Sequence, residues 1–104
     1  MKKSLLLLAV ASVALTFGAQ AATPDEILTK SGCLACHKTD KKVVGPSYKD
    51  VAVKYKGQDA SAKVMEKIRK GGSGVYGPIP MPANPEAKIS DADLKTVVDY
   101  ILKL

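Results

Sequence analysis

The chain has 104 residues, a formal net charge of +6 at pH 7 and two cysteines. Its lysines are scattered, whereas a nucleic-acid-binding arm would be more concentrated and more aromatic, so the charge argues against that class and suits transient docking onto acidic proteins. A single domain of this size buries little apolar surface, so a covalent cross-link or a large cofactor is expected to stabilise it.

Residues 1–21 have the three parts of a secretory signal peptide. Two lysines at positions 2 and 3 are followed by the apolar run Leu5–Phe17 and by an Ala-Gln-Ala triplet that ends at residue 21. The run is shorter than the ~20 apolar residues that a membrane-spanning helix needs, which makes a transmembrane anchor the weaker interpretation. We expect export, cleavage after residue 21, no membrane span in the remaining chain, and one domain over residues 22–104.

Two short helices are predicted on either side of the cysteine motif. The first begins with Thr23 as N-cap and Pro24 at the first helical position, and it ends at about Ser31, before a glycine. The second has an apolar face with the spacing i, i+3, i+4, i+7 and ends before Gly57. That face consists of Tyr48, Val51, Ala52 and Tyr55.

Two further helices are predicted nearer the C-terminus. One begins near Asp59 or Ser61, carries Val64, Met65 and Ile68 on one face, and ends at a pair of glycines at positions 71 and 72. The other begins at Ser90, in a capping box that has Asp in place of Glu. Its apolar stripe is Leu94, Val97, Val98, Ile101 and Leu102. No segment alternates like a β-strand over a useful length, so an all-α fold is expected.

Cys33, Cys36 and His37 form a C-x-x-C-H motif, the attachment signature of c-type haem. The two thiols add to the haem vinyl groups as thioethers, and the adjacent imidazole binds the iron. A structural zinc site would need four ligands, and a thioredoxin-like pair would need a βαβ setting, neither of which the sequence offers. A plain disulfide would leave the histidine and the later proline-rich segment unexplained.

Composition narrows the choice of the sixth iron ligand. His37 is the only histidine, which excludes bis-histidine ligation within one chain and leaves Met, Lys or water. Met65 shares an apolar helix face with Ile68 and is interpreted as core packing. Met81 lies in a Pro-Ile-Pro-Met-Pro run within residues 71–84, where the prolines fix φ and limit the entropy lost on ligation. We therefore expect Met81 to be the ligand, held by a stiff, extended strap.

The C-x-x-C-H motif, a Val-Gly-Pro turn at 44–46 and the Gly-Val-Tyr-Gly-Pro-Ile-Pro-Met-Pro run at 74–82 resemble the short-chain class I bacterial cytochromes c. The resemblance covers essentially all of residues 22–104. It implies a periplasmic carrier with four short helices around one covalent haem c, the first and last helices crossing, and with His37 and Met81 as the two iron ligands. The apolar residues expected around the haem or between the helices are Tyr48, Val51, Met65, Ile68, Leu94, Val98 and Ile101.

The resemblance extends to residues beside the ligands. It implies that the backbone carbonyl of Pro46 accepts a hydrogen bond from His37, which fixes the ring and raises its basicity, and that Asn84 lies near the methionine sulfur. Tyr76 stands where many members have a tryptophan that hydrogen-bonds a haem propionate. Lys67 stands where some members have an arginine near a propionate, and a lysine binds without the bidentate fork. The sequence leaves open whether these two residues contact the propionates.

An iron with both axial positions filled indicates electron transfer and argues against an enzyme, because no substrate reaches the metal without displacing a ligand. We expect a monomer that carries electrons from a respiratory complex to a terminal oxidase, nitrite reductase or peroxidase. Four lysines that flank the motif are expected to steer docking. They are Lys30, Lys38, Lys41 and Lys42. The alternatives are a haem-based peroxidase or gas sensor with a labile Met81, and a small haem subunit of a permanent complex.

Overall fold

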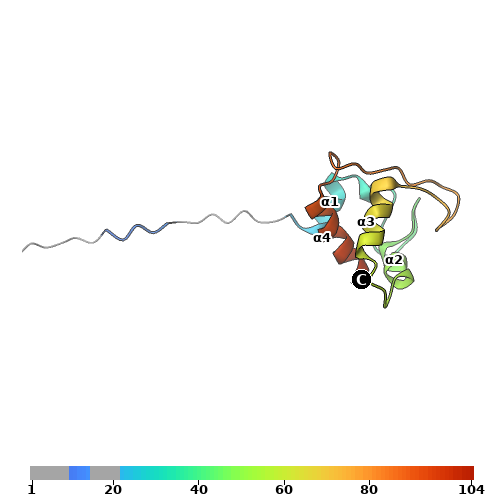
Figure 1. Ribbon diagram of the computed structural model, residues 1–104, viewed down its shortest axis with the longest axis horizontal. Helices are drawn as coiled ribbons and strands as arrows, with labels where there is room; N and C mark the ends of the chain where they lie inside the picture. The colour runs from blue at the N-terminus through green and yellow to red at the C-terminus, as the bar shows by residue number, and fades with distance from the viewer. Residues whose placement is uncertain (1–9, 15–21) are drawn as a thin grey trace, which may run out of the picture.

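The computed structural model describes residues 10–14 and 22–104, so most of the expected signal peptide, 1–21, lies outside the described residues. The described part contains four α-helices and one turn of 3₁₀ helix, η1, and its only β-type pairings are isolated bridges. In chain order the elements are α1 (Pro24–Lys30), η1 (Cys33–Ala35), α2 (Tyr48–Lys54), α3 (Ser61–Lys70) and α4 (Asp91–Leu102) (Figure 1). The predicted all-α fold is confirmed. None of these helices is long and apolar enough to cross a bilayer.

Hydroxyl side chains fix the starts of three helices. Thr23 begins α1 with a complete capping box, in which its Oγ1 accepts from the backbone N–H of Glu26 at 3.3 Å and Glu26 Oε2 accepts from the backbone N–H of Thr23 at 3.2 Å. The hydroxyls of Ser47 and Ser90 cap α2 and α4 in the same way, each accepting from the backbone N–H three residues on. Each cap satisfies a backbone donor that the helix leaves free, which contributes about 1 kcal/mol.

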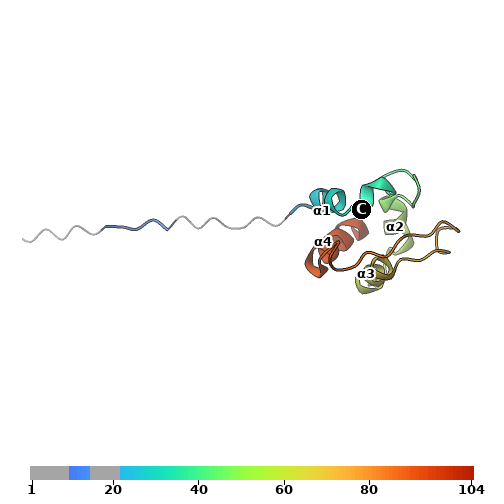
Figure 2. The same ribbon diagram turned by 90° about the horizontal axis from the view of Figure 1, so that it is seen from above.

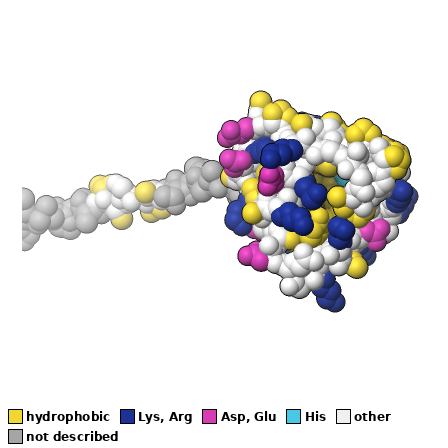
Figure 3. All heavy atoms as spheres, turned by 45° about the vertical axis from the view of Figure 1, so that its right-hand side comes forward, with side chains coloured by type: hydrophobic (Ala, Val, Ile, Leu, Met, Phe, Trp, Pro, Cys, Tyr) yellow, Lys and Arg dark blue, Asp and Glu magenta, His cyan; other side chains and the backbone are white. Residues whose placement is uncertain are grey.

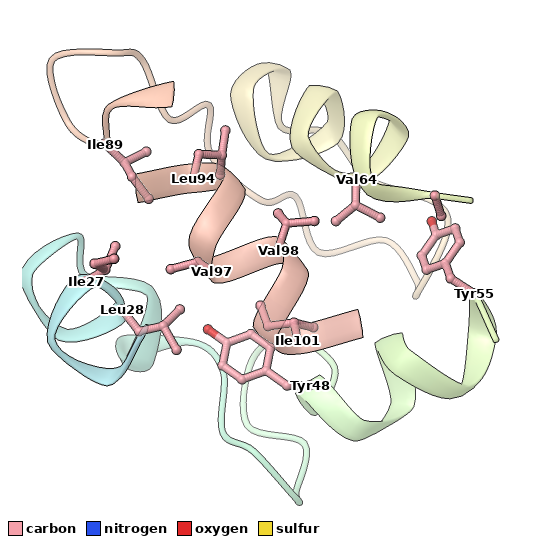
Figure 4. Packing of buried hydrophobic residues seen from close by; sticks show 11 residues of the cluster. Ile27, Leu28, Tyr48, Tyr55, Val64, Ile89, Leu94, Val97, Val98 and Ile101 are labelled. Carbon is pink, nitrogen blue, oxygen red and sulfur yellow. The ribbon is translucent and has the colours of Figure 1, made fainter. Parts of the chain in front are cut away.

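Helix α4 is the centre of the packing and contacts α1, α2 and α3 (Figures 1 and 2). Four of the five residues of its predicted apolar stripe lie in the core, each at most 4% exposed: Leu94, Val97, Val98 and Ile101. The fifth, Leu102, is half-buried against the core. Figure 4 shows these side chains surrounded by Leu28 of α1, Tyr48 of α2 and Val64 of α3. The first and last helices therefore pack against each other, as expected.

Three of the apolar residues expected around the haem or between the helices are only half-buried. Val51 and Ile68 are half-buried because they face a cavity rather than the helix interfaces, and Met65 packs against the edge of the core. The core also takes in a residue outside the helices that the helical patterns did not single out. This is Ile89, which is 4% exposed and lies just before α4. It closes the space between the start of α4 and α1 (Figure 4).

The strap loop, residues 71–84, turns back on itself and is not extended throughout. Gly72 and Met81 exchange two backbone hydrogen bonds, of 3.0 and 2.9 Å, and the N–H of Gly74 donates to the carbonyl of Gly77 at 2.8 Å. Both glycines of the turn have positive φ, which a side chain would resist. The two limbs run side by side (Figure 2). The structure thus differs from the predicted strap because the glycines reverse the chain, and the prolines stiffen only the returning limb.

Candidate functional site

A cavity of about 330 Å³ lies between η1, α2, α3 and the strap loop, with α4 contributing to its wall. Figure 3 shows apolar side chains in a hollow of the surface, with basic side chains around it. All of the site residues predicted from the sequence line this one cavity. They are Cys33, Cys36, His37, Pro46, Lys67, Tyr76, Met81 and Asn84. Segments far apart in the chain therefore meet at the predicted site.

The turn η1 presents the two cysteines and the histidine together. Gly32, at φ 76°, ends α1 and redirects the chain into η1. The backbone N–H groups of Cys36 and His37 then donate to the carbonyl of Cys33 at 3.2 and 3.1 Å. Both thiols are half-buried and free, and burial raises the pKa of the Cys33 thiol. Two free thiols on one tight turn can form two bonds to a group inside the cavity.

His37 is held on three sides. Its Nδ1 lies 2.8 Å from the carbonyl oxygen of Pro46, and because a carbonyl only accepts, Nδ1 carries the proton. The ring stacks on Tyr48, with centroids 5.2 Å apart and planes 20° apart. The backbone of Gly45 lies against the ring on a further side, so close that a Cβ at this residue would lie 2.8 Å from Nδ1. The other nitrogen, Nε2, is left as the basic atom that can bind a metal.

Met81 is held through the backbone on either side of it. Its own N–H and carbonyl pair with Gly72. Gly71 lies against the same stretch of backbone, where any Cβ would collide with the Met81 carbonyl and with the backbone of Pro82. The Met81 side chain is half-buried and lines the cavity. A thioether in this position can bind a soft metal centre.

Asn84 fixes the end of the strap loop. The residue is 4% exposed, and its Nδ2 donates to the carbonyls of Ile68 and Pro82, both at 3.1 Å. Two acceptors use both hydrogens of the amide nitrogen. The amide expected near the methionine sulfur belongs to a residue three positions after Met81 in the loop, and carbonyl groups rather than sulfur accept the hydrogen bonds from its Nδ2. Asn84 acts on the position of the loop.

Tyr76 and Lys67 line the cavity from the strap loop and from α3. The ring of Tyr76 lies beside Lys54, whose Nζ is 5.7 Å from the Tyr76 centroid and 6.0 Å from the Tyr55 centroid. Burial raises the pKa of Tyr76. Its hydroxyl, which any tyrosine keeps protonated at neutral pH, can donate a hydrogen bond. Sequence reasoning missed Lys54, because nothing in its spacing marks a contact across to the loop.

The buried hydroxyl of Tyr48 belongs to a residue of the cavity wall next to His37. Tyr48 is 4% exposed, and within the described part of the chain its hydroxyl has no hydrogen-bond partner. Burial raises the pKa of Tyr48 far above its ordinary value, so the group is neutral. The sequence identified Tyr48 as part of an apolar helix face and as one of the apolar residues around the haem or between the helices, and did not identify its hydroxyl.

The family model for cytochrome c matches residues 22–104. The chain belongs to the cytochrome c family. Among curated relatives, cytochrome c2 of Rubrivivax gelatinosus is 54% identical over 79% of this chain and 98% of the relative. Cytochrome c-551 of Pseudomonas aeruginosa is 43% identical over 95% of this chain and 93% of the relative. The crystal structure of wild-type cytochrome c552 of Nitrosomonas europaea is 46% identical, covers 77% of this chain and 98% of its own, and superposes with a TM-score of 0.70.

As a small class I cytochrome c, the protein carries one covalently attached haem c with its iron. The residues present suit this group. The cavity is lined mainly by apolar side chains, and its polar part includes two free thiols on one turn, an imidazole with Nε2 available, and a thioether. In the described part of the chain no three His, Cys, Asp or Glu side chains gather as a zinc site would need. The predicted cofactor and the relationship to electron-carrying cytochromes are confirmed.

Proposed function

We propose that this cytochrome c is a periplasmic, monomeric electron carrier in which Cys33 and Cys36 attach the haem and His37 and Met81 are the axial ligands. One observation carries the proposal: a single cavity collects both thiols, the imidazole and the thioether, although Met81 is distant in the chain from the other three. These donor types are those that attach a c-type haem and complete its iron. The relatives are likewise electron-carrying cytochromes rather than enzymes.

When bound, haem iron supplies a change of one electron between its ferric and ferrous states. The chain holds the ligands still during that change. The hydrogen bond from His37 Nδ1 to Pro46 raises the basicity of Nε2, and the contacts of the ring with Gly45 and Tyr48 prevent its rotation. The backbone pairing of Met81 with Gly72 holds the thioether. Ligands that move little keep the reorganisation energy of electron transfer small.

The surface around the cavity suits brief contacts with other redox proteins. Lys42 lines the cavity, and the other three lysines near the motif are exposed. Exposed apolar side chains also line the cavity, including Val44 at 43% and Ile79 at 62% exposure. Positive charge speeds an encounter with an acidic partner, and a small apolar rim lets the complex separate quickly. The proposed donor is a respiratory complex, and the proposed acceptor is a terminal oxidase, nitrite reductase or peroxidase.

Export to the periplasm remains part of the proposal. Its support is the basic start, apolar run and Ala-Gln-Ala triplet of residues 1–21, together with haem attachment to free thiols, which suits a protein working outside the cytoplasm. N-terminal sequencing of the protein recovered from the periplasmic fraction tests this. A mature chain beginning at Ala22 is expected, and a protein retained in the membrane with its N-terminus intact contradicts cleavage.

Carbon monoxide distinguishes the carrier from a gas sensor or peroxidase. In a carrier, Met81 occupies the position that the gas would need, so the reduced holoprotein is expected to keep its absorption spectrum when carbon monoxide is added at neutral pH. The variant Met81→Ala, which lacks the thioether, is the matched positive control and is expected to bind the gas. Ready binding by the wild-type protein would contradict the carrier and favour the sensor.

A further inference from the structure

Arg69, near the end of α3, joins three separate parts of the fold. Its Nη1 donates to the carbonyl oxygens of Asn84, at 3.1 Å, and Ile89, at 2.6 Å, while Nη2 pairs with Asp91 Oδ1 at 2.6 Å. The Arg69 side chain is 21% exposed, so its two bonds to carbonyl oxygens are partly shielded from water, whereas the pair with Asp91 is exposed. The two carbonyls belong to the end of the strap loop and to the residue that enters the core before α4.

The contacts of Arg69 continue through Asn84 to the residue beside Met81. The side chain of Asn84 donates to the Pro82 carbonyl, and its backbone N–H donates to the carbonyls of Ile68 and Arg69 at 3.2 and 3.1 Å. Pro82 follows Met81 directly. The returning limb of the strap loop is therefore fastened at its far end to the last turn of α3, and the guanidinium is the only charged group in this chain of contacts that is mostly buried.

We infer that Arg69 is a positioning residue, which holds the strap loop closed and thereby keeps Met81 in the cavity. The inference rests on the proposed role of Met81 as a ligand. Charge-assisted bonds from a guanidinium are stronger than those between neutral groups, and its planar fork serves several acceptors at once. A lysine, as a single point charge, cannot reach both carbonyls and the carboxylate in this geometry. The two carbonyl bonds matter most, because Asp91 is 75% exposed and an exposed ion pair contributes little.

The neighbouring residue provides a matched control. Lys70 pairs with Glu66 at 2.6 Å within α3, with both side chains largely exposed, and its hydrogen bond does not involve the strap loop. Replacing Lys70 or Arg69 by methionine removes the same charge from adjacent positions of one helix. Only Arg69→Met removes the hydrogen bonds to the strap loop.

Amide hydrogen exchange on the holoproteins of the wild type, Arg69→Met, Arg69→Lys and Lys70→Met tests the inference. In Arg69→Met, the amides of Met81 and Asn84 are expected to exchange about tenfold faster, as the loss of a charged hydrogen bond implies. Arg69→Lys should lie between that variant and the wild type, and Lys70→Met should match the wild type. The amide of Val98, buried in α4, reports general unfolding and is expected to change less than the loop amides.

A second readout separates this inference from the proposed ligation. The near-red absorption band of sulfur bound to ferric iron is expected to disappear at a pH about one unit lower in Arg69→Met, because a tenfold easier opening shifts the midpoint by that amount. Exchange in Arg69→Met that matches Lys70→Met, or that rises equally at Val98, would overturn the positioning role. A wild type without the band, combined with faster loop exchange in Arg69→Met, would support the tether and reject Met81 as the ligand.

Discussion

Gly45 packs so closely against the imidazole of His37 that a Cβ at position 45 would lie 2.8 Å from Nδ1 and 3.0 Å from Nε2. The φ of Gly45 is not positive, so the backbone itself would accept another residue. Glycine is therefore needed at this position because the ring occupies the space that a side chain would take. This contact, with the hydrogen bond to Pro46, ties the orientation of the ring to the turn at residues 44–46.

The first prediction concerns this contact. Gly45→Ala is expected to displace the His37 ring and to lower the free energy of unfolding by about 1–3 kcal/mol, as overpacking does, with a changed reduction potential. Gly57→Ala is the control, because Gly57 has φ 78° but open space around it. This variant is expected to lose stability through backbone strain alone and to leave the haem spectrum unchanged. Chemical denaturation and redox titration measure both variants. An unchanged potential in Gly45→Ala would contradict the close contact.

The second prediction concerns the buried hydroxyl of Tyr48. Since this oxygen has no partner within the described residues, Tyr48→Phe is expected to leave the free energy of unfolding unchanged or to raise it by up to ~1 kcal/mol. Tyr55→Phe, at another buried tyrosine of the core, is the comparison. Urea denaturation of the holoproteins measures the difference. A loss greater than ~1 kcal/mol in Tyr48→Phe would mean that the hydroxyl does have a hydrogen-bond partner in the folded protein.

The third prediction concerns acid stability. Hydrogen bonds from Lys95 and Ser61 lower the pKa of Asp99 below its ordinary value of 3.8. A lowered folded-state pKa stabilises the protein above the ordinary pKa, and the stabilisation is lost as the pH falls through the lowered value. Asp99→Asn should therefore lose stability at pH 7 but little at pH 2, as measured by thermal unfolding across that range. Equal losses at both pH values would show that the Asp99 charge is not the cause.

The fourth prediction concerns docking. Lys42→Glu changes a charge at the cavity and is expected to slow electron transfer to an acidic partner several-fold at low ionic strength. The effect should fade towards ~0.15 M salt, where the Debye length is about 8 Å. Lys103→Glu makes the same charge change at a residue that does not line the cavity. Stopped-flow rates against ionic strength measure both variants, and equal slowing by the two would indicate net charge rather than a docking face.

The sequence alone sufficed for features that depend on near neighbours. Thr23 and Pro24 mark the start of α1, and the spacing of the α4 stripe marks the core face, because caps and helical periodicity are local. The reversal of the strap loop was not predicted, since the pairing of Gly72 with Met81 depends on how the glycines turn.

The contacts of long side chains were also beyond sequence reasoning. Arg69 reaches carbonyls fifteen and twenty residues further along the chain, and no periodicity or motif encodes such a distance. The burial of Ile89 belongs to the same class, because it depends on where the loop enters α4. By contrast, the C-x-x-C-H motif identified the site because haem attachment demands a fixed local spacing.

The near-red absorption band of the oxidised holoprotein tests the central claim, that an imidazole and a thioether clamp one iron. We expect the band in the wild type and in Met65→Leu, because the Met65 side chain packs at the edge of the core, and we expect its loss in Met81→Ala. Persistence of the band in Met81→Ala, or its absence from the wild type, would contradict the account.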